Sequence, residues 1–259
     1  MSCAVSLRPT GSRYGAAMSV SWSVALSWRM RRQLLNPIGT APVADVVRRL
    51  GAVPASAAEL AIRVRRVRSR PGEVARALAE GRLIKAYAFR GATHLLTPED
   101  GGAYLALRAA SRMWELPSWQ RFYGLAPDDW PSLRKVVREA LADGPMTRDE
   151  LGVAVTARRT FRHLAAAFDG SDTLLKPLTW QGDMSFGPPR DGRTTFQRLD
   201  TNPRWAGLPD PDRPGQQALE ELTPSNDPEW ISAELERVAE SRLLLEDGEE
   251  MGFADVADP

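Results

Sequence analysis

The chain has 259 residues, of which 43% are hydrophobic and 26% are charged. This composition is typical of a chain with one or two buried cores and excludes the fibrous, collagenous and fully disordered classes. One cysteine, Cys3, and two histidines exclude an internal disulfide and leave little room for a metal site or a serine triad. We therefore expect no metal, no cofactor and a cytoplasmic protein. No segment reaches the roughly 18 apolar residues of a membrane span.

The charges are sorted along the sequence, although the net charge is only +1. Residues 29–90 contain 14 Lys and Arg against four Asp and Glu, whereas residues 220–259 contain 13 Asp and Glu against two Arg. A polyanion would be attracted to the first segment and repelled by the second. This pattern predicts that the first third of the chain binds nucleic acid.

The first part of the chain changes from helical to strand periodicity. Apolar spacing, proline starts and glycine stops predict helices at 24–34, 42–50 and 57–68, and from residue 73 to Gly81. The period then falls to 2, and residues 83–89 and 93–96 around Arg90-Gly91 predict a β-hairpin. A capped helix from Thr97 to about Trp114 follows. Helices followed by a hairpin indicate a winged helix-turn-helix unit over residues 20–114.

A second copy of this pattern follows a proline-containing connector at 115–128. Helices are expected at 130–142, from the capping box Thr147–Glu150 onward, and at 158–168. Strands are expected at 173–180, 184–186 and 194–199. The predicted fold is α+β and mostly α, with tandem winged-helix units and short β-hairpin wings, the second unit occupying residues 129–202. Five aromatic residues near the connector are interpreted as packing between the units: Trp114, Trp119, Phe122, Tyr123 and Trp130.

The two ends of the sequence are expected to lie outside these units. Residues 1–19 are predicted to be a disordered leader, with Met18 as the working start. Residues 203–259 begin as a proline-rich linker and continue as a divergent acidic tail with one amphipathic helix at 228–245.

Three stretches carry a resemblance to a known family. They are Arg48 to Val53, the run from Arg76 to Leu83, and Phe89 to Asp100, which contains an Arg-Gly-x-x-His-Leu hairpin. Together they resemble the winged-helix DNA-binding family that includes the AlkZ/YcaQ-type DNA glycosylases. Residues 174–188 are similar to the second winged-helix unit of its members. The resemblance covers about residues 20–218 and fades near Leu219.

The resemblance implies tandem winged-helix units around a DNA channel. In the enzymatic branch it also implies excision of alkylated or cross-linked bases without a metal. That branch carries a glutamine, an apolar residue and a glutamine or aspartate shortly after the leucine-glycine turn, and these side chains place the attacking water. The matching positions here are Pro54, Ala55 and Ser56. Proline has no side-chain donor or acceptor and an unassisted serine is a poor base, so the mechanism does not carry over residue by residue.

The predicted partner is double-stranded DNA, held mainly through its phosphates because guanidinium groups match phosphate oxygens. Five arginines lie within residues 63–70 without matching acids nearby. A solvated helix face is the alternative interpretation of this run. The predicted DNA-binding residues are Arg48, Arg49, Arg63, Arg66, Arg70, Arg76, Arg82, Lys85 and Arg90, with Lys176, Arg190 and Arg193 near the second wing.

Four residues are candidates for a catalytic role: Ser56, His94, Gln181 and Asp183. His94 is expected either to be a hairpin histidine bonded to the backbone or to lie beside a flipped base. Trp180 to Asp183 could line a base pocket, with the indole stacking on the base, or form a turn with a packed tryptophan.

Three hypotheses follow. The first is a DNA-binding protein, possibly acting in DNA repair, that grips duplex DNA through its arginine-rich surface. The second is a monofunctional DNA glycosylase that flips a damaged base and uses the four candidates to orient water. The third is a defective relative whose acidic tail covers the basic surface.

Overall fold

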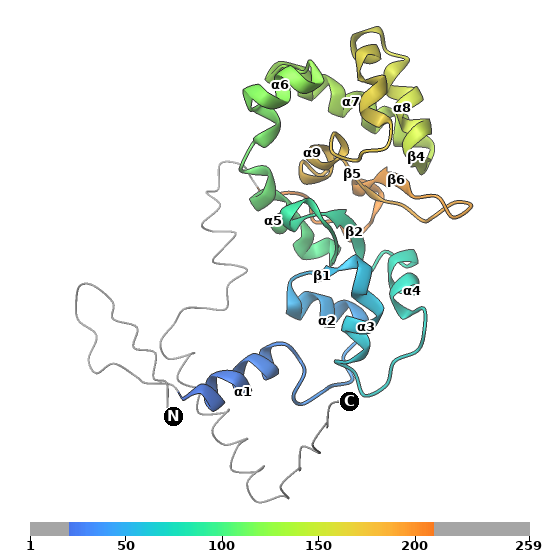
Figure 1. Ribbon diagram of the computed structural model, residues 1–259. Helices are drawn as coiled ribbons and strands as arrows, with labels where there is room; N and C mark the ends of the chain where they lie inside the picture. The colour runs from blue at the N-terminus through green and yellow to red at the C-terminus, as the bar shows by residue number, and fades with distance from the viewer. Residues whose placement is uncertain (1–20, 210–259) are drawn as a thin grey trace, which may run out of the picture. The chain divides into compact units, whose positions relative to one another are not determined.

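The computed structural model describes residues 21–209, and its elements are labelled in Figure 1. The chain divides into two units: helix α1 (Trp22–Arg32) belongs to one, and Ile38–Thr223 forms the other. Ser21 caps α1 by accepting a hydrogen bond from the Val24 backbone N–H at 3.4 Å. The expected leader, and the acidic tail with its helix at 228–245, lie outside the described residues.

Three short helices pack against one another at the start of the second unit: α2 (Val43–Leu50), α3 (Ala58–Arg63) and α4 (Glu73–Ala79). They bury Val46, Val47, Ile62 and Ala77. Gly51 and Gly81 follow α2 and α4 with φ of 79° and 67°, where a residue with a Cβ would be strained. The helices expected at 42–50 and from residue 73 are confirmed.

Helix α3 ends earlier than the sequence predicted. After Arg63 the chain leaves the helix, and Arg66 forms a parallel bridge with Gly39. The Val67 N–H donates to the Gly39 carbonyl at 2.9 Å, and the Gly39 N–H donates to the Arg65 carbonyl at 3.2 Å. The expected helix at 57–68 is therefore wrong beyond Arg63, and the arginines at 65–70 do not continue a helical face.

The predicted hairpin is present and gains a third strand. Strands β2 (Ile84–Tyr87) and β3 (Thr93–Leu96) pair antiparallel, and β1 (Val53–Pro54) pairs with the other edge of β3. Arg90 and Gly91 form the turn with φ of 55° and 69°. The sheet order is β1-β3-β2.

The second half of the unit repeats this order of elements. Helix α7 (Trp130–Ala140) is followed by β4 (Met146–Thr147), α8 (Arg148–Thr156), a run of 3₁₀ turns (Arg159–Phe168), α9 (Leu175–Trp180), β5 (Met184–Phe186) and β6 (Thr195–Arg198). Its sheet has the order β4-β6-β5. The capping box is confirmed, because the Glu150 N–H donates to Thr147 Oγ1 at 3.3 Å and the Thr147 N–H donates to the Glu150 carboxylate at 2.8 Å.

Residues 175–180 form helix α9 rather than the expected strand at 173–180. The error has a physical reason. Pro177 falls in the first turn, where a helix tolerates proline, and Leu175, Leu178 and Trp180 are all buried. A continuous apolar run is compatible with either a buried strand or a buried helix, so periodicity alone cannot separate them.

The connection between the two halves packs into the main core. Helix α5 (Pro98–Ala109) contacts α9, and α6 (Pro117–Tyr123) leads toward α7 (Figure 1). Trp114, Tyr123 and Trp130 are buried, as their expected packing role requires, whereas Phe122 is 79% exposed. Trp114 lies beyond the end of α5, in one of the short 3₁₀ turns. These are Ala55–Ala57, Phe89–Gly91, Met113–Glu115, Pro127–Asp129, Leu141–Asp143 and Leu199–Thr201.

The fold is mixed α and β and mostly helical, as predicted in its coarse form. Of the helices that the structure describes, none combines the length and the apolar character needed to cross a membrane. The two sheets meet through β2 and β5, where the rings of Tyr87 and Phe186 lie 4.9 Å apart.

One close backbone contact in this unit gives a stability prediction. A Cβ on Gly102 of α5 would lie 1.8 Å from the Gly207 carbonyl oxygen. Gly102→Ala should therefore lower the free energy of unfolding by about 1–3 kcal/mol, although alanine is the better helix former by about 1 kcal/mol. Chemical denaturation measures this change.

Gly101→Ala is the matched control in the same helix. Its Cβ would meet the terminal methyl of Ile84 at 2.9 Å, and a side chain can move aside more easily than backbone. If Gly102→Ala proves as stable as Gly101→Ala, the close approach of residues 207–208 to α5 is contradicted.

Candidate nucleic-acid interface

Eight of the predicted DNA-binding arginines are exposed, and five of these have no carboxylate partner among the described residues: Arg49, Arg63, Arg70, Arg76 and Arg90. These five come from the ends of α2 and α3, the segment before α4, α4 itself and the hairpin turn. Among the described residues none of their guanidinium groups has a carboxylate partner. These side chains therefore keep their full set of donors for a ligand.

Arg48 and Arg82 are already paired with carboxylates. Arg48 lies 2.7 Å from Asp45, 3.4 Å from Glu99 and 3.3 Å from Asp100. Arg82 donates to Glu80 at 2.7 Å. A phosphate would have to displace these carboxylates, so both residues are weaker candidates than the sequence indicated.

Arg66 ties the segment after α3 to the start of α4. It forms an ion pair with Glu73, and both side chains are largely buried. Glu73 also accepts hydrogen bonds from Ser69 Oγ at 3.0 Å and from the Arg70 N–H at 3.1 Å. The hydrogen bond from the Arg70 backbone and the contacts with Arg66 and Ser69 lower the pKa of the Glu73 carboxyl below its ordinary value. This geometry supports a structural role for Arg66 in place of phosphate binding.

The second predicted wing is closed by ion pairs. Arg190 pairs with Glu150 and Arg193 pairs with Asp149, both carboxylates lying in the first turn of α8. Arg190 and Arg193 also form an isolated antiparallel bridge with each other. The loop between β5 and β6 is thus held against α8, and its two arginines are partly neutralised.

Two lysines lie where the sheets meet. Lys85 Nζ lies 4.7 Å from the centre of the Phe186 ring, and Lys176 Nζ lies 5.6 Å from that of Tyr87. Lys176 also passes Gly91, where a Cβ would lie 3.3 Å from its Nζ. The predicted residues Arg90, at the hairpin turn, and Lys176, on α9, are therefore brought near each other by the fold.

Two of the catalytic candidates lie near the β1–β3 pairing. Pro54 is the register partner of His94, and Ser56 is two residues further along the chain. His94 Nδ1 is 3.0 Å from the Ala92 carbonyl, and the Phe89 ring stands perpendicular to the imidazole at 5.4 Å. The buried histidine thus has the backbone bond expected of a hairpin histidine, and Ser56 is exposed.

The other two candidates lie beside α7. Asp183 is buried and binds Arg134 through both carboxylate oxygens, at 2.6 and 3.2 Å. Burial raises the pKa of the Asp183 carboxyl, and the Arg134 contacts oppose that rise. The Gln181 side-chain amide donates to the Pro177 carbonyl at 3.2 Å. Trp180 is 1% exposed, so of the two alternatives for this residue the structure favours the packed tryptophan over the indole that stacks on a base.

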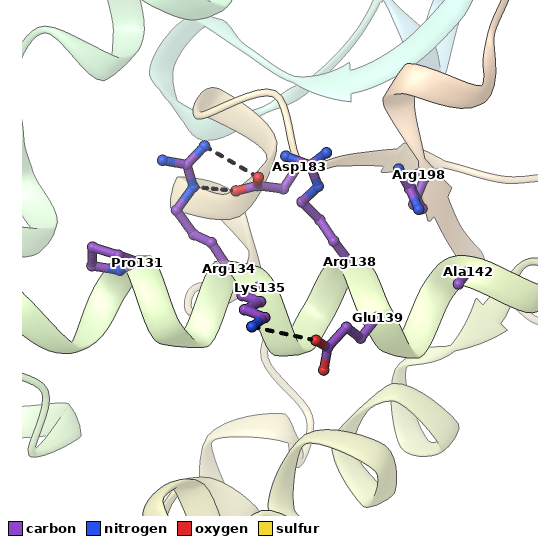
Figure 2. A pocket seen from close by; sticks show the side chains of 8 residues that line it. All are labelled: Pro131, Arg134, Lys135, Arg138, Glu139, Ala142, Asp183 and Arg198. Atoms are coloured by element: carbon purple, nitrogen blue, oxygen red, sulfur yellow. Dashed lines mark hydrogen bonds and ion pairs between the residues drawn. The ribbon is translucent and has the colours of Figure 1, made fainter.

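An open depression of about 550 Å³ beside α7 was missed from the sequence. Figure 2 shows Arg134 and Arg138 rising from one side of α7 toward Asp183 and Arg198. The signal was the spacing of Arg134 and Arg138, which are four residues apart and therefore on one side of α7, next to the buried Leu133 and Val137. In the part of the chain that the structure describes, no group of three or more His, Cys, Asp or Glu could hold a metal ion.

Comparisons with known proteins show the family to which the chain belongs. A family model described as DNA glycosylase AlkZ-like matches residues 47–258. The chain belongs to this AlkZ-like family. The match continues past Leu219, so the expected fading of the resemblance there is wrong. The expected family resemblance itself is confirmed.

Two relatives of the AlkZ-like chain come from Streptomyces sahachiroi. A protein named interstrand DNA cross-link repair glycosylase is 36% identical over 201 residues, which are 75% of this chain and 54% of that protein. The solved structure named DNA glycosylase AlkZ superposes with a TM-score of 0.72 at 34% identity, covering 79% of this chain and 56% of that one. The chain thus spans about half the length of these relatives.

The Glu73 cluster of this AlkZ-like chain predicts a pH dependence. A carboxyl whose pKa is lowered by folding stabilises the protein above its unfolded pKa of about 4.3, and that stabilisation is lost as the pH falls through the folded value. Glu73→Gln should lower the unfolding temperature at pH 7, and the difference from wild type should shrink below about pH 4. Thermal unfolding followed by circular dichroism measures both.

Asp128→Asn is the control, because Asp128 is exposed and has no hydrogen bond or ion pair within the described residues. It should shift the unfolding temperature little at either pH. If the difference in unfolding temperature between Glu73→Gln and wild type stays constant down to pH 3, the charge of the Glu73 carboxylate does not contribute to stability.

Proposed function

We propose that this chain is a winged-helix protein that binds duplex DNA and acts in DNA repair. The observation that carries the proposal is the set of five exposed arginines, around α2, α3, α4 and the hairpin turn, that have no carboxylate partner among the described residues. The AlkZ-like family match supports the assignment to DNA, since its relatives are named as DNA glycosylases.

The order of elements supports two winged-helix units. Each half has a helix, a short strand, further helices and two strands, and in both sheets the first strand pairs with the third. In helix-turn-helix proteins the second helix of the motif enters the major groove. By that analogy α4, with the exposed Arg76, is the helix that contacts the groove, and the hairpin turn with Arg90 is the wing. The proposed boundaries remain residues 20–114 and 129–202.

Phosphate binding by these arginines predicts a steep salt dependence. Each phosphate contact contributes about one unit to the slope of log K against log salt. Replacing Arg49, Arg70 and Arg76 together by glutamine should lower the magnitude of that slope by about 3. Fluorescence anisotropy of a labelled duplex at several salt concentrations measures it.

Arg112→Gln is the matched control, since it removes one positive charge from an exposed arginine that is paired with Glu115 at 2.7 Å. It should leave the slope within error of the wild-type value. Wild-type protein whose DNA binding shows no salt sensitivity would remove the proposed function.

Base excision is a second candidate function, favoured by membership of the AlkZ-like family. The register that sets Pro54 opposite His94 brings an exposed serine and a buried imidazole to one end of the sheet. The polar residues that the family resemblance implies at positions 54 and 56 are replaced by proline and serine. For this reason the binding function stands first.

An excision assay separates the two candidates. The chain is incubated with an N7-alkylguanine duplex at saturating concentration, and alkali-labile abasic sites are measured. The binding proposal expects intact DNA. If abasic sites form, the enzymatic candidate is correct. In that case Ser56→Ala and His94→Gln should each slow the single-turnover rate, whereas the control Arg112→Gln should not.

A further inference from the structure

The depression beside α7 contains more cations than its own carboxylates can neutralise. Four cationic side chains line it, from Arg134, Lys135, Arg138 and Arg198, together with two carboxylates, from Asp183 and Glu139. Two more charged residues pair with this lining: Asp200 with Arg138 and Arg198, and Arg158 with Glu139. Among the described residues this leaves five cations against three carboxylates, an excess of two positive charges.

The cations that line the depression differ in how completely they are paired. Arg134 is held by the buried Asp183, whose side chain is 1% exposed, through two oxygens, and also donates to the Gln181 carbonyl at 3.1 Å. This pair therefore forms a fixed floor. Lys135, by contrast, is 77% exposed, and its Nζ forms a loose ion pair with Glu139 at 4.0 Å. Glu139 also accepts a hydrogen bond from Arg158 at 3.2 Å.

Of the four cations that line the depression, Arg138 has the most unused donors. A guanidinium has five N–H donors, and Arg138 spends one of them on Asp200, at 3.0 Å. Arg198 binds both oxygens of the same carboxylate, at 2.9 and 2.7 Å. One carboxylate thus serves two guanidinium groups that face the same open space, as Figure 2 shows for Arg138 and Arg198.

We propose that Arg138 and Arg198, with Lys135 at the rim, form a phosphate-binding site in the depression between α7 and β6. A phosphate monoester carries close to two negative charges, and two neighbouring backbone phosphates of DNA carry the same total, so either would match the excess of two. Guanidinium groups hold phosphate oxygens through paired N–H donors. A phosphate group offers three acceptor oxygens to the donors of the two arginines, whereas a carboxylate ligand would offer only two.

The phosphate group that binds at this site belongs either to the DNA backbone or to free phosphate. The DNA source rests on the proposed function, whereas phosphate binding itself does not. Arg138 and Arg198 lie on α7 and β6, whereas the arginines that carry the DNA-binding proposal lie around α2, α3, α4 and the turn between β2 and β3. The two ideas can therefore fail separately.

The experiment uses the full chain with Arg138→Gln, Arg198→Gln, Arg138→Lys and Asp200→Asn, and Arg112→Gln as the charge-matched control. In the first arm a labelled duplex is titrated at several salt concentrations. Arg138→Gln and Arg198→Gln should each lower the slope of log K against log salt by about 1. Arg138→Lys should retain it. Asp200→Asn should tighten binding several-fold, because it removes the carboxylate that competes with phosphate.

In the second arm the line width of inorganic phosphate is followed by ³¹P NMR. Wild type and Asp200→Asn should broaden the line, and the two arginine-to-glutamine variants should broaden it less than Arg112→Gln does. Thermal unfolding confirms that each variant is folded, and the opposite directions expected for Asp200→Asn and Arg138→Gln separate binding from loss of structure.

The outcomes are distinct. Effects in both arms support a site that takes DNA phosphates. An effect on the phosphate line without any DNA binding by wild type supports a free-phosphate site and removes the proposed function. If all four variants behave as Arg112→Gln does in both arms, the phosphate site is overturned while the DNA-binding proposal stands.

Discussion

The proposed DNA-binding function depends on a competition between the protein's own carboxylates and external anions for the same guanidinium groups. An arginine whose donors are already satisfied offers a phosphate little, because the incoming ion must first release a partner of the same charge. Arg66 and Arg134 are of this kind: each is bound to a largely buried carboxylate. Breaking the Arg134–Asp183 pair would leave the Asp183 charge buried and uncompensated, which costs about 3–5 kcal/mol in comparable cases. These residues stabilise the fold.

The exposed arginines differ from Arg66 and Arg134, because no carboxylate competes with an external anion for their donors. Arg49, Arg70 and Arg76 have no carboxylate partner among the described residues, and their charge lies in solvent. Such side chains contribute little to stability, since exposed charges are well solvated whether or not they find a partner. In the proposed function they contribute to binding, because each phosphate that they neutralise would release condensed counterions. The sorting of arginines into these two groups is the main functional result of the fold.

The sequence predicted well those features that depend on neighbouring residues. The hairpin of residues 84–96 follows from strand alternation around Arg90-Gly91, and the capping box follows from Thr147 and Glu150. Each of these signals is complete within a few residues. The AlkZ-like resemblance was likewise carried by short runs, which lie at the end of α2, on α4 and in the hairpin.

The sequence could not predict features that depend on distant partners. Asp183 lies 49 residues from Arg134, and Asp200 lies 62 residues from Arg138, so nothing local marks either pair. The run at 175–180 became a helix because tertiary packing buries it on all sides, and α3 ended at Arg63 because Gly39 offered the next residues a backbone partner. The sequence identified the positive charges, but only the folded chain shows which of them remain available.

The contact between the two sheets fixes the two halves of the second unit against each other. Tyr87 of β2 packs on Phe186 of β5, and its hydroxyl donates to Asp172, which also accepts from Arg148 at 2.6 Å. Burial and the Asp172 contact raise the pKa of the Tyr87 hydroxyl well above its ordinary value, so it remains a donor at any physiological pH. This network joins the half that carries the exposed arginines to the half that carries the depression. Groups held in place before binding lose less conformational entropy when a ligand arrives. If both sets of cations bind one polyanion, as proposed, this junction lowers the entropic cost relative to a flexible linker.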